Sequence, residues 1–399
     1  MAWGEVSVKF ERESFCQAIL DGKLSMAHAC RQYKISRPTG YDWLARYRKE
    51  GVPGLNNRDL GRLTQSQKTS IEKEDLILLM KYEFSKWGPK KIYTTLNKRY
   101  PDIDWPQTTT IHNILKKNGL VQPRRLRRLL ATVNKNLQTS ESPNDVWCMD
   151  FKGWHMTSDR VKFDPFTLTD HESRYLIRCN KLKSNNTEHV WAVLETAFRE
   201  YGLPNFIRSD NGPPFATCCP GRLSKLAIML IKAGITPQWI EPGNPQENGR
   251  HERMHLTMKQ EGFALGSSLK EQIDIMDEFI EYYNFERPHE ALNQKTPGSI
   301  YVPSNRVWTG KLNPVEYSSE YKAILVRCCG NISWKSAQVY VSRVLEGERV
   351  GVKETEKGFE MYYANMFLGI ITKDLKLDVV RRKTRVKKPY LIKKEDNVK

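Results

Sequence analysis

The chain has 399 residues, which suggests two to four domains rather than one. Its hydrophobic residues (39%) and aromatic residues (10%) exclude a fully disordered chain, and no apolar run approaches the ~18 residues that span a bilayer. The formal net charge of +18 favours a polyanionic partner, because each phosphate contact releases counterions. Charge therefore selects a partner class, nucleic acid above all, but no activity.

The cysteines and the first residues bear on the compartment. None of the eight cysteines forms a CxxC pair, and the two adjacent pairs suit a disulfide framework poorly. The first 14 residues, MAWGEVSVKFERES, lack the charged-then-apolar layout of a signal peptide. We therefore expect reduced thiols in a cytoplasmic protein without a membrane partner.

Residues 1–57 are expected to form a helix-turn-helix domain. Ser25 and Ser36 stand where they can cap the second and third helices, and Pro38 is tolerated in a first helical turn. The spacing makes residues 37–47 the candidate recognition helix, with Arg37, Thr39 and Tyr41 as candidate DNA contacts. A small helical bundle without DNA contact is the alternative.

Residues 64–122 predict a second three-helix unit, of helix-turn-helix or winged-helix-like type. Thr108 and Thr109 are its candidate DNA contacts, on the last helix. A basic linker, residues 123–142, follows with four arginines that are also candidate DNA contacts: Arg124, Arg125, Arg127 and Arg128. Such a run is either a solvated linker or a segment that follows a DNA groove.

The sequence pattern of residues 143–303 predicts an α/β domain. Three β-branched and aromatic segments are followed by a helix over 188–201, a short strand over 205–209, a helix over 222–233 and a strand over 236–240. Helices over 246–261 and 269–283 complete the order. This order predicts a mixed five-stranded sheet with helices on both faces, and a ligand site at the carboxyl ends of its strands.

The remaining residues predict a β domain and a tail. Short alternating segments separated by Gly, Asn and charged turns over 304–378 predict a small β-barrel or meander. Residues 379–399 are rich in Lys and Arg and are expected to form a basic tail that touches DNA.

Two aspartates lie at unusual positions, one where burying a charge costs free energy and one where the chain must turn sharply. Asp150 lies in a strand that is otherwise apolar on both faces, and Asp210 ends another strand before Asn211-Gly212. If the two strands are neighbours, the two carboxylates repel each other unless a cation lies between them. Magnesium suits that place, because it takes a few carboxylate oxygens and keeps water or phosphate as further ligands.

A third carboxylate has two candidates in the segment GNPQENGRHERMH. Glu247 and Glu252 are five residues apart, so on one helix they diverge by about 140° and only one can face the aspartates. The residues alone leave this choice open.

Three segments together resemble a known family. WCMDFKG, RSDNGPPF and GNPQENGRHERMH are similar to the catalytic core of integrase-type DDE transposases, which share a ribonuclease H-like fold with retroviral integrases, and most closely to those of bacterial insertion sequences. The resemblance places the metal-binding glutamate at Glu252 and puts Asn248 and Lys259 beside the donor DNA end. YYNFERPHEAL resembles the motif that follows this core, at Asn284, Arg287, Pro288 and His289.

The resemblance implies a function. Asp150, Asp210 and Glu252 would be the catalytic and metal-binding residues, with two Mg²⁺ ions for which Mn²⁺ substitutes. The substrates would be the terminal inverted repeats of a mobile element and its double-stranded target DNA, with a homo-oligomer on paired ends at the bacterial nucleoid. A DNA-binding regulator without catalysis, or a ribonuclease H-type nuclease without strand joining, are the alternatives.

Overall fold

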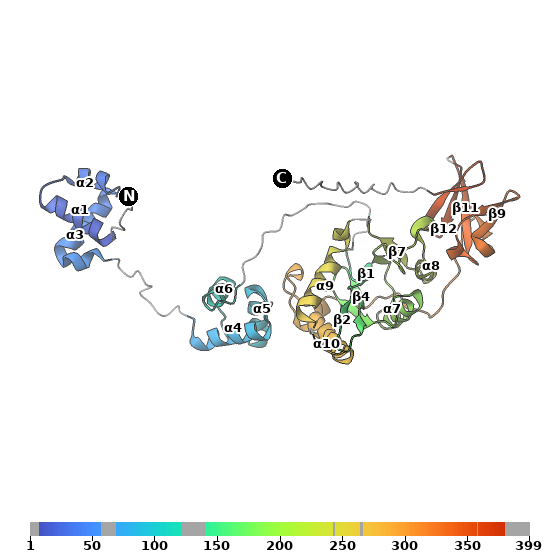
Figure 1. The fold of residues 1–399 in the computed structure, drawn as a ribbon, viewed down its shortest axis with the longest axis horizontal. Helices are drawn as coiled ribbons and strands as arrows, with labels where there is room; N and C mark the ends of the chain where they lie inside the picture. Colours follow the sequence, from blue (N-terminus) through green and yellow to red (C-terminus); the bar gives the residue numbers. More distant parts are fainter. Residues whose placement is uncertain are drawn as a thin grey trace, which may run out of the picture. The chain divides into compact units, whose positions relative to one another are not determined.

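A computed structural model describes residues 8–56, 69–121, 137, 140–241, 244–263, 266–356 and 358–379 (Figure 1). By its contacts the chain divides into two compact units, Met1–Ser70 and Ile71–Lys399. The four linker arginines and the basic residues from Arg381 onward lie outside the described residues. Across the described residues, no helix combines the length and apolarity needed to cross a bilayer.

The first unit is a bundle of three helices, α1 (Val8–Leu20), α2 (Met26–Gln32) and α3 (Arg37–Glu50), closed by a short 3-10 turn. The predicted caps are confirmed, since the Ser25 hydroxyl accepts from the His28 N–H and the Ser36 hydroxyl from the Thr39 N–H. Helices α2 and α3 approach closely at Gly40, where an added Cβ would lie 2.7 Å from Cys30 Sγ. A larger residue there would force the recognition helix off the bundle.

Three more helices begin the second unit: α4 (Ile71–Glu83), α5 (Pro89–Arg99) and α6 (Thr108–Lys117). Ile77, Ile92 and Ile111, one from each helix, are fully buried in a common core. Helix α6 begins at Thr108, and before it the buried Trp105 indole donates to the Tyr100 carbonyl oxygen at 3.2 Å.

The α/β domain contains the predicted mixed sheet. Its strand order is β5-β4-β1-β6-β7, formed by β1 (Val146–Phe151), β4 (Pro165–Asp170), β5 (Leu176–Lys181), β6 (Phe206–Ser209) and β7 (Thr236–Trp239). Strand β1 pairs antiparallel with β4 and parallel with β6, and β6 pairs parallel with β7. The two aspartate-bearing segments are therefore neighbours at the centre of the sheet.

Helices cover both faces of this sheet. On one face α7 (Thr187–Tyr201) and α8 (Lys225–Lys232) pack against β1 through a core that includes Trp147, Leu194 and Leu226. On the other face α9 (Gly249–Glu261) and α10 (Leu269–Glu281) pack against β5 through Met254 and Phe279. Alternate residues of β1 point to opposite faces, so Trp147 and Met149 serve the first core while Asp150 points to the α9 side.

Two predicted elements are interrupted in the structure. The first predicted strand ends at Phe151, and the chain then forms a separate hairpin of β2 (His155–Met156) and β3 (Lys162–Phe163). The helix predicted from residue 246 begins at Gly249, after a 3-10 turn over Pro245–Asn248. Both breaks occur beside the carboxylates, where the chain turns at Gly153 (φ 87°) and at the start of α9.

The C-terminal β domain is an open sheet over the residues described, so the predicted closed barrel is not observed. Its strand order is β14-β13-β12-β11-β8, with a separate hairpin of β9 (Asn331–Trp334) and β10 (Ala337–Tyr340). The sheet strands are β8 (Lys322–Leu325), β11 (Arg349–Thr355), β12 (Gly358–Tyr363), β13 (Met366–Ile371) and β14 (Leu377–Asp378). The hairpin packs on the sheet through Ile332 and Val339. The edge strands β8 and β14 have four and two residues and pair with inner strands only, which leaves the sheet unclosed.

Candidate active site

Asp150 and Asp210 lie side by side at the carboxyl ends of two parallel strands. The register of β1 and β6 pairs Cys148 with Arg208. Asp150 and Asp210 each follow these residues by two positions, so their side chains lie on the same face of the sheet. Local hydrogen bonds orient both carboxylates: Asp150 Oδ1 accepts from the Phe151 N–H at 2.8 Å, and Asp210 Oδ1 from the Gly212 N–H at 3.0 Å. The close pair predicted from the sequence is thus present.

The electrostatics of Asp150 show which other carboxylate is near. The pKa of Asp150 is raised to about 7, first by burial and then by the negative charges of Asp210 and Glu252, while the Phe151 N–H and Lys152 act to lower it. Glu252 lies on the first turn of α9 and is exposed. It is therefore Glu252, of the two glutamates that the sequence left open, whose charge acts on Asp150.

Glu247 has a different role. One of its carboxylate oxygens accepts from the Glu241 N–H at 2.9 Å and the other from Asn244 Nδ2 at 3.4 Å. Its own carbonyl oxygen accepts from Arg208 at 3.3 Å. These hydrogen bonds stabilise the turn that leads into α9, so the Glu247 carboxylate is used to hold the backbone there.

The donors suit a divalent cation with oxygen ligands. The Asp150 side chain is 24% exposed, and the imidazole 3.9 Å from its Oδ2, that of His255, is neutral because burial lowers its pKa to about 2. The repulsion between neighbouring carboxylates is relieved when Mg²⁺ binds between them. Among the described residues, however, no three His, Cys, Asp or Glu side chains lie close enough together to hold a metal ion. The structure pairs the aspartates and brings Glu252 into electrostatic range without gathering the three into a closed site.

Two histidines of α9 fasten this helix to the strand beside β1. His251 Nε2 and His255 Nε2 lie 2.8 and 2.7 Å from Thr167 Oγ1, and His251 Nδ1 lies 2.6 Å from Thr169 Oγ1. The Thr167 hydroxyl also donates to the carbonyl oxygen of Asp150 at 3.0 Å. Burial lowers the pKa of His251 to about 3, so this network positions the helix without adding positive charge beside the carboxylates.

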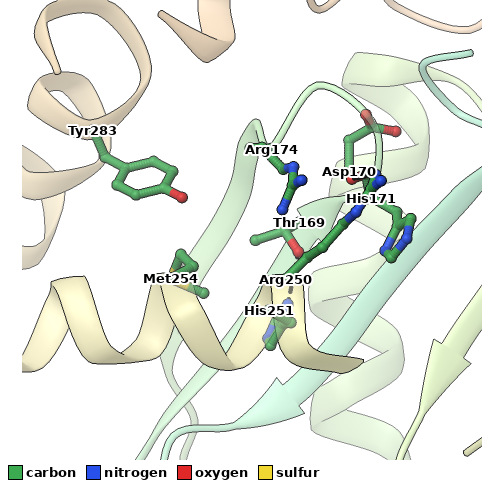
Figure 2. Close-up of a pocket in the computed structure, with 8 residues that line it drawn as sticks. All are labelled: Thr169, Asp170, His171, Arg174, Arg250, His251, Met254 and Tyr283. Atoms are coloured by element: carbon green, nitrogen blue, oxygen red, sulfur yellow. Dashed lines mark hydrogen bonds between the residues drawn. The ribbon is translucent and has the colours of Figure 1, made fainter. Parts of the chain in front are cut away.

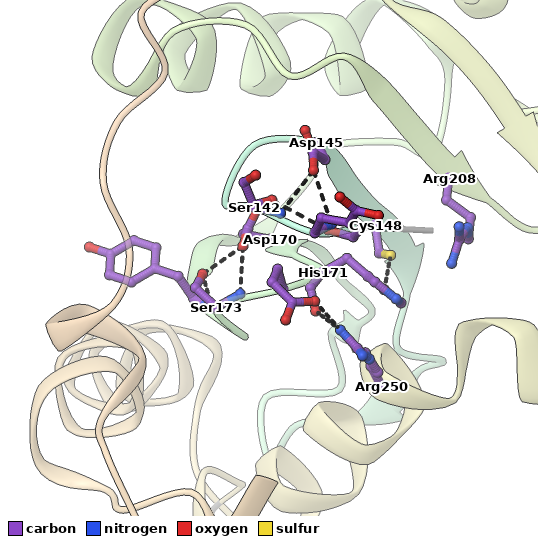
Figure 3. A network of polar contacts seen from close by, with 12 residues as sticks. Ser142, Asp145, Cys148, Asp170, His171, Ser173, Arg208 and Arg250 are labelled. Atoms are coloured by element: carbon purple, nitrogen blue, oxygen red, sulfur yellow. Dashed lines mark hydrogen bonds and ion pairs between the residues drawn. The ribbon is translucent and has the colours of Figure 1, made fainter. Parts of the chain in front are cut away.

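An arginine fixes the start of α9 from the other side. Arg250 Nη1 donates to the His171 carbonyl oxygen at 2.9 Å and to Glu172 at 2.7 Å, in the loop after β4 (Figure 3). Arg250 and Arg174 line one small pocket with Tyr283 (Figure 2). The sequence reasoning missed these arginines and both α9 histidines. The signal available for the histidines was their i, i+4 spacing on the inner face of a predicted helix.

The motif after the core, at Asn284, Arg287, Pro288 and His289, forms a joint, that is, a segment whose side chains connect several helices and strands. The buried Asn284 side chain accepts from the Leu176 N–H at 2.8 Å and donates to the Leu176 carbonyl oxygen at 2.9 Å, so it pairs with the outer strand β5 as a further strand would. His289 is half-buried, and its ring packs against Tyr283 with centroids 4.7 Å apart. Asn284 lies in a π-helical turn (Tyr282–Glu286) that continues α10.

The same segment connects the helices α4–α6 to the α/β domain. Trp87 Nε1 donates to the Tyr282 hydroxyl at 2.8 Å, which donates in turn to Glu261 at 2.7 Å. Arg287 makes two further bonds to Glu261, at 2.9 and 3.2 Å. Lys91 is half-buried at this joint, and its desolvation, with the positive charge of Arg287, lowers its pKa to about 7. Since Glu261 ends α9, the helices α4–α6 are bonded to the helix that carries Glu252 in its first turn.

The candidate DNA contacts have different surroundings. Arg37, Thr39 and Tyr41 are exposed on the first turns of α3. Thr108 is half-buried and Thr109 exposed at the start of α6.

The two contacts implied by the resemblance to transposases also differ. Lys259 is exposed, two turns after Glu252 on nearly the same face of α9. Asn248 is 3% exposed and its Oδ1 has no hydrogen-bond partner, so a DNA contact there requires the start of α9 to move.

Comparisons with known families decide the wider assignment. Two models described as integrase core domains match residues 140–245 and 233–297, and a helix-turn-helix domain model matches residues 11–63. Residues 140–297 of the chain thus match an integrase core domain. The predicted resemblance to insertion-sequence transposases is confirmed by these matches together with two relatives from insertion elements.

Both relatives are proteins of bacterial insertion elements. The integrase-core chain is 24% identical over 218 residues to a 39.2 kDa protein of insertion element IS476 from Xanthomonas euvesicatoria, covering 54% of this chain and 60% of that protein. It is 25% identical over 193 residues to a 31.7 kDa protein of IS407 from Burkholderia multivorans, covering 48% and 67% respectively. The chain thus spans about three fifths of the first relative's length.

The solved structures that match the chain include an integrase catalytic core. The HTLV-2 integrase catalytic core domain in complex with magnesium is 15% identical with a TM-score of 0.32, covering 41% of this chain and 99% of that one. A chain of the simian T-cell lymphotropic virus intasome in complex with PP2A regulatory subunit B56 gamma is 14% identical with a TM-score of 0.36, covering 75% and 99%.

Proposed function

We propose that this integrase-core protein is a DNA transposase that binds the terminal inverted repeats of a mobile element and catalyses metal-dependent strand cleavage and strand transfer. The observation that carries the proposal is the carboxylate arrangement. Asp150 and Asp210 share one face at the ends of neighbouring parallel strands, and the charge of Glu252 acts on Asp150. A protein that only bound DNA would gain nothing from this repulsion, which raises the pKa of a central strand residue.

The chain's own residues supply binding and orientation. Asp150 and Asp210 offer carboxylate oxygens from the sheet, while the His251 and His255 bonds to Thr167 hold α9, which carries Glu252, against that sheet. A pair of Mg²⁺ ions held there would activate the attacking water or hydroxyl and stabilise the leaving oxygen of an in-line displacement. Because the pKa of Asp150 is about 7, metal binding near neutral pH releases a proton from this carboxyl and tightens as the pH rises.

The expected partners follow from the proposal. Element ends and target DNA are double-stranded, and joining two ends calls for at least two copies of the chain. Arg37, Thr39 and Tyr41 lie exposed on a helix of the type that enters the major groove, and Thr108 and Thr109 begin a second such helix. The place of action would be the bacterial cytoplasm, at the nucleoid when bound.

Incubation of the full chain with DNA carrying the inverted repeats that flank its gene tests this function. Mg²⁺ or Mn²⁺ should support cleavage at the repeat and joining to a second duplex. Ca²⁺ should support binding with little chemistry, because it is larger and looser in geometry. Specific binding without cleavage in Mg²⁺ and Mn²⁺ would show a regulator, and cleavage without joining would show a nuclease.

A further inference from the structure

The hairpin that follows the Asp150 strand presents large apolar side chains to solvent. Trp154 is 58% exposed and Met156 53% exposed. Of the tryptophans in the described part of the chain, Trp154 is the only one this exposed. A large apolar surface beside a polar site commonly marks a contact with a ligand or partner.

The exposure of Trp154 does not come from a loose backbone. The Lys152 N–H donates to the Pro165 carbonyl oxygen at 3.1 Å, and the Gly153 N–H to Asp164 Oδ1 at 3.0 Å. At the far end of the hairpin the Ser158 N–H donates to the Ser267 carbonyl oxygen at 2.9 Å. The segment is therefore held on both sides of the ring.

The strand alternation turns the ring outward. His155 packs inward, with its ring centroid 4.6 Å from that of Phe263 and 5.3 Å from that of Phe163. Its neighbours Trp154 and Met156 consequently point away from the domain. A fixed, outward-facing indole is a preformed platform that loses little conformational entropy when something stacks on it.

A lysine lies over the indole. Lys162 Nζ, on the paired strand of the hairpin, lies 5.1 Å from the Trp154 ring centroid. Lys152 precedes Trp154 by two residues in the chain. An aromatic face with lysine beside it is the arrangement that proteins use to bind unpaired nucleic acid, with a base on the ring and phosphates on the cations.

The position along the chain relates the ring to the reacting strand. Trp154 follows Asp150 by four residues, which an extended chain spans in at most about 13 Å. Since bases along one DNA strand are spaced by about 3.4 Å when stacked, the ring lies within a few nucleotides of a phosphodiester held at the carboxylates.

We propose that Trp154 stacks on an unpaired base of the DNA strand next to the phosphodiester that is cut, with Lys162 and Lys152 at the flanking phosphates. The inference rests on the proposed strand cleavage at Asp150 and Asp210. It adds a binding site that helps to open the duplex at the element end. Unstacking and unpairing a base costs a few kcal/mol, and stacking on an indole offsets part of that cost.

The test uses the full chain in Ca²⁺ with element-end duplexes carrying 2-aminopurine at each nucleotide around the cut in turn. We expect one position to change its fluorescence on wild-type binding and to keep the unbound signal with Trp154→Ala. Affinity for the end should fall roughly 5- to 100-fold, and Trp154→Phe should recover part of both signals. Cleavage in Mg²⁺ should fall with Trp154→Ala and recover on a duplex mismatched at the responding nucleotide.

Tyr340→Ala is the matched control, because Tyr340 is also 58% exposed but lies in the C-terminal β domain. It should leave 2-aminopurine fluorescence, affinity and cleavage unchanged. A Trp154→Ala protein with wild-type fluorescence and cleavage would overturn the inference. So would a loss of self-association by sedimentation with unchanged 2-aminopurine signal, which would assign the ring to a protein contact. Failure of the wild type to cleave any end would instead overturn the proposed function, whatever the fluorescence shows.

Discussion

Replacing Asp150 with Asn should make the protein more stable while abolishing its chemistry. The pKa of Asp150 is raised from 3.8 to about 7, so between about pH 4 and pH 7 the folded chain keeps a proton that the unfolded chain has lost. Stability therefore falls as pH rises through this window, and the full penalty is present above it. A shift of roughly three units corresponds to at most about 4 kcal/mol, and partial exposure reduces the expected gain to about 1–3 kcal/mol.

Hydrogen exchange of the β1 amides in the full chain, at pH 5 and pH 8, measures this effect locally. Asn keeps the Oδ1 that accepts from the Phe151 N–H, so Asp150→Asn should slow exchange at pH 8 and change it little at pH 5. Mg²⁺ should stabilise β1 in the wild type but not in the variant. Asp274→Asn, an exposed charge on α10, is the control and should stay within about 0.5 kcal/mol. If Asp150→Asn destabilised β1 at pH 8, the repulsion inferred among the carboxylates would be refuted.

Three further outcomes follow from named contacts. Asn284→Ala leaves the Leu176 N–H and carbonyl unpaired and should cost about 2–4 kcal/mol in urea unfolding, and a loss below about 0.5 kcal/mol would contradict the joint. Arg37→Ala or Tyr41→Ala in the full chain should weaken binding to the terminal repeat more than to scrambled DNA in gel shifts, whereas equal losses would place end recognition elsewhere. Lys259→Gln should weaken assembly on the donor end and lower the salt slope by about one unit without changing metal preference, and wild-type values for both would make this lysine ordinary surface.

The sequence predicted the elements where hydrophobic periodicity is strong. The mixed five-stranded sheet could be expected, because β-branched segments alternate with amphipathic helices such as α7 and α8, whereas its strand order was not predicted. The prediction from the sequence was wrong where the chain turns beside the carboxylates. Nothing in the apolar segment before Met156 indicated that the chain leaves the sheet at Lys152 and Gly153 and forms a separate hairpin. Closure of the C-terminal sheet was also overestimated, since alternation predicts strands but not which edges pair.

Only part of the candidate site could be predicted from the types and order of its residues. Asp150 and Asp210 could be singled out as costly charges at strand ends, but the choice between Glu247 and Glu252 depended on resemblance until the electrostatics of Asp150 were available. The His251 and His255 bonds to Thr167 join residues more than 80 positions apart. Such long-range polar pairs leave no local pattern, so a single sequence does not reveal them.

Strand transfer by carboxylate variants is the measurement that bears most directly on the proposed chemistry. Asp150→Asn, Asp210→Asn, Glu252→Gln and Glu247→Gln would be compared with wild type on flanking-repeat DNA in Mg²⁺ and Mn²⁺, with end binding measured in Ca²⁺. The first three should bind ends nearly as wild type and lose joining by at least about 1,000-fold, as expected for groups that hold catalytic metals. Glu247→Gln should retain joining, because its side chain closes the turn before α9. Substantial joining by Glu252→Gln together with loss in Glu247→Gln would contradict the assignment.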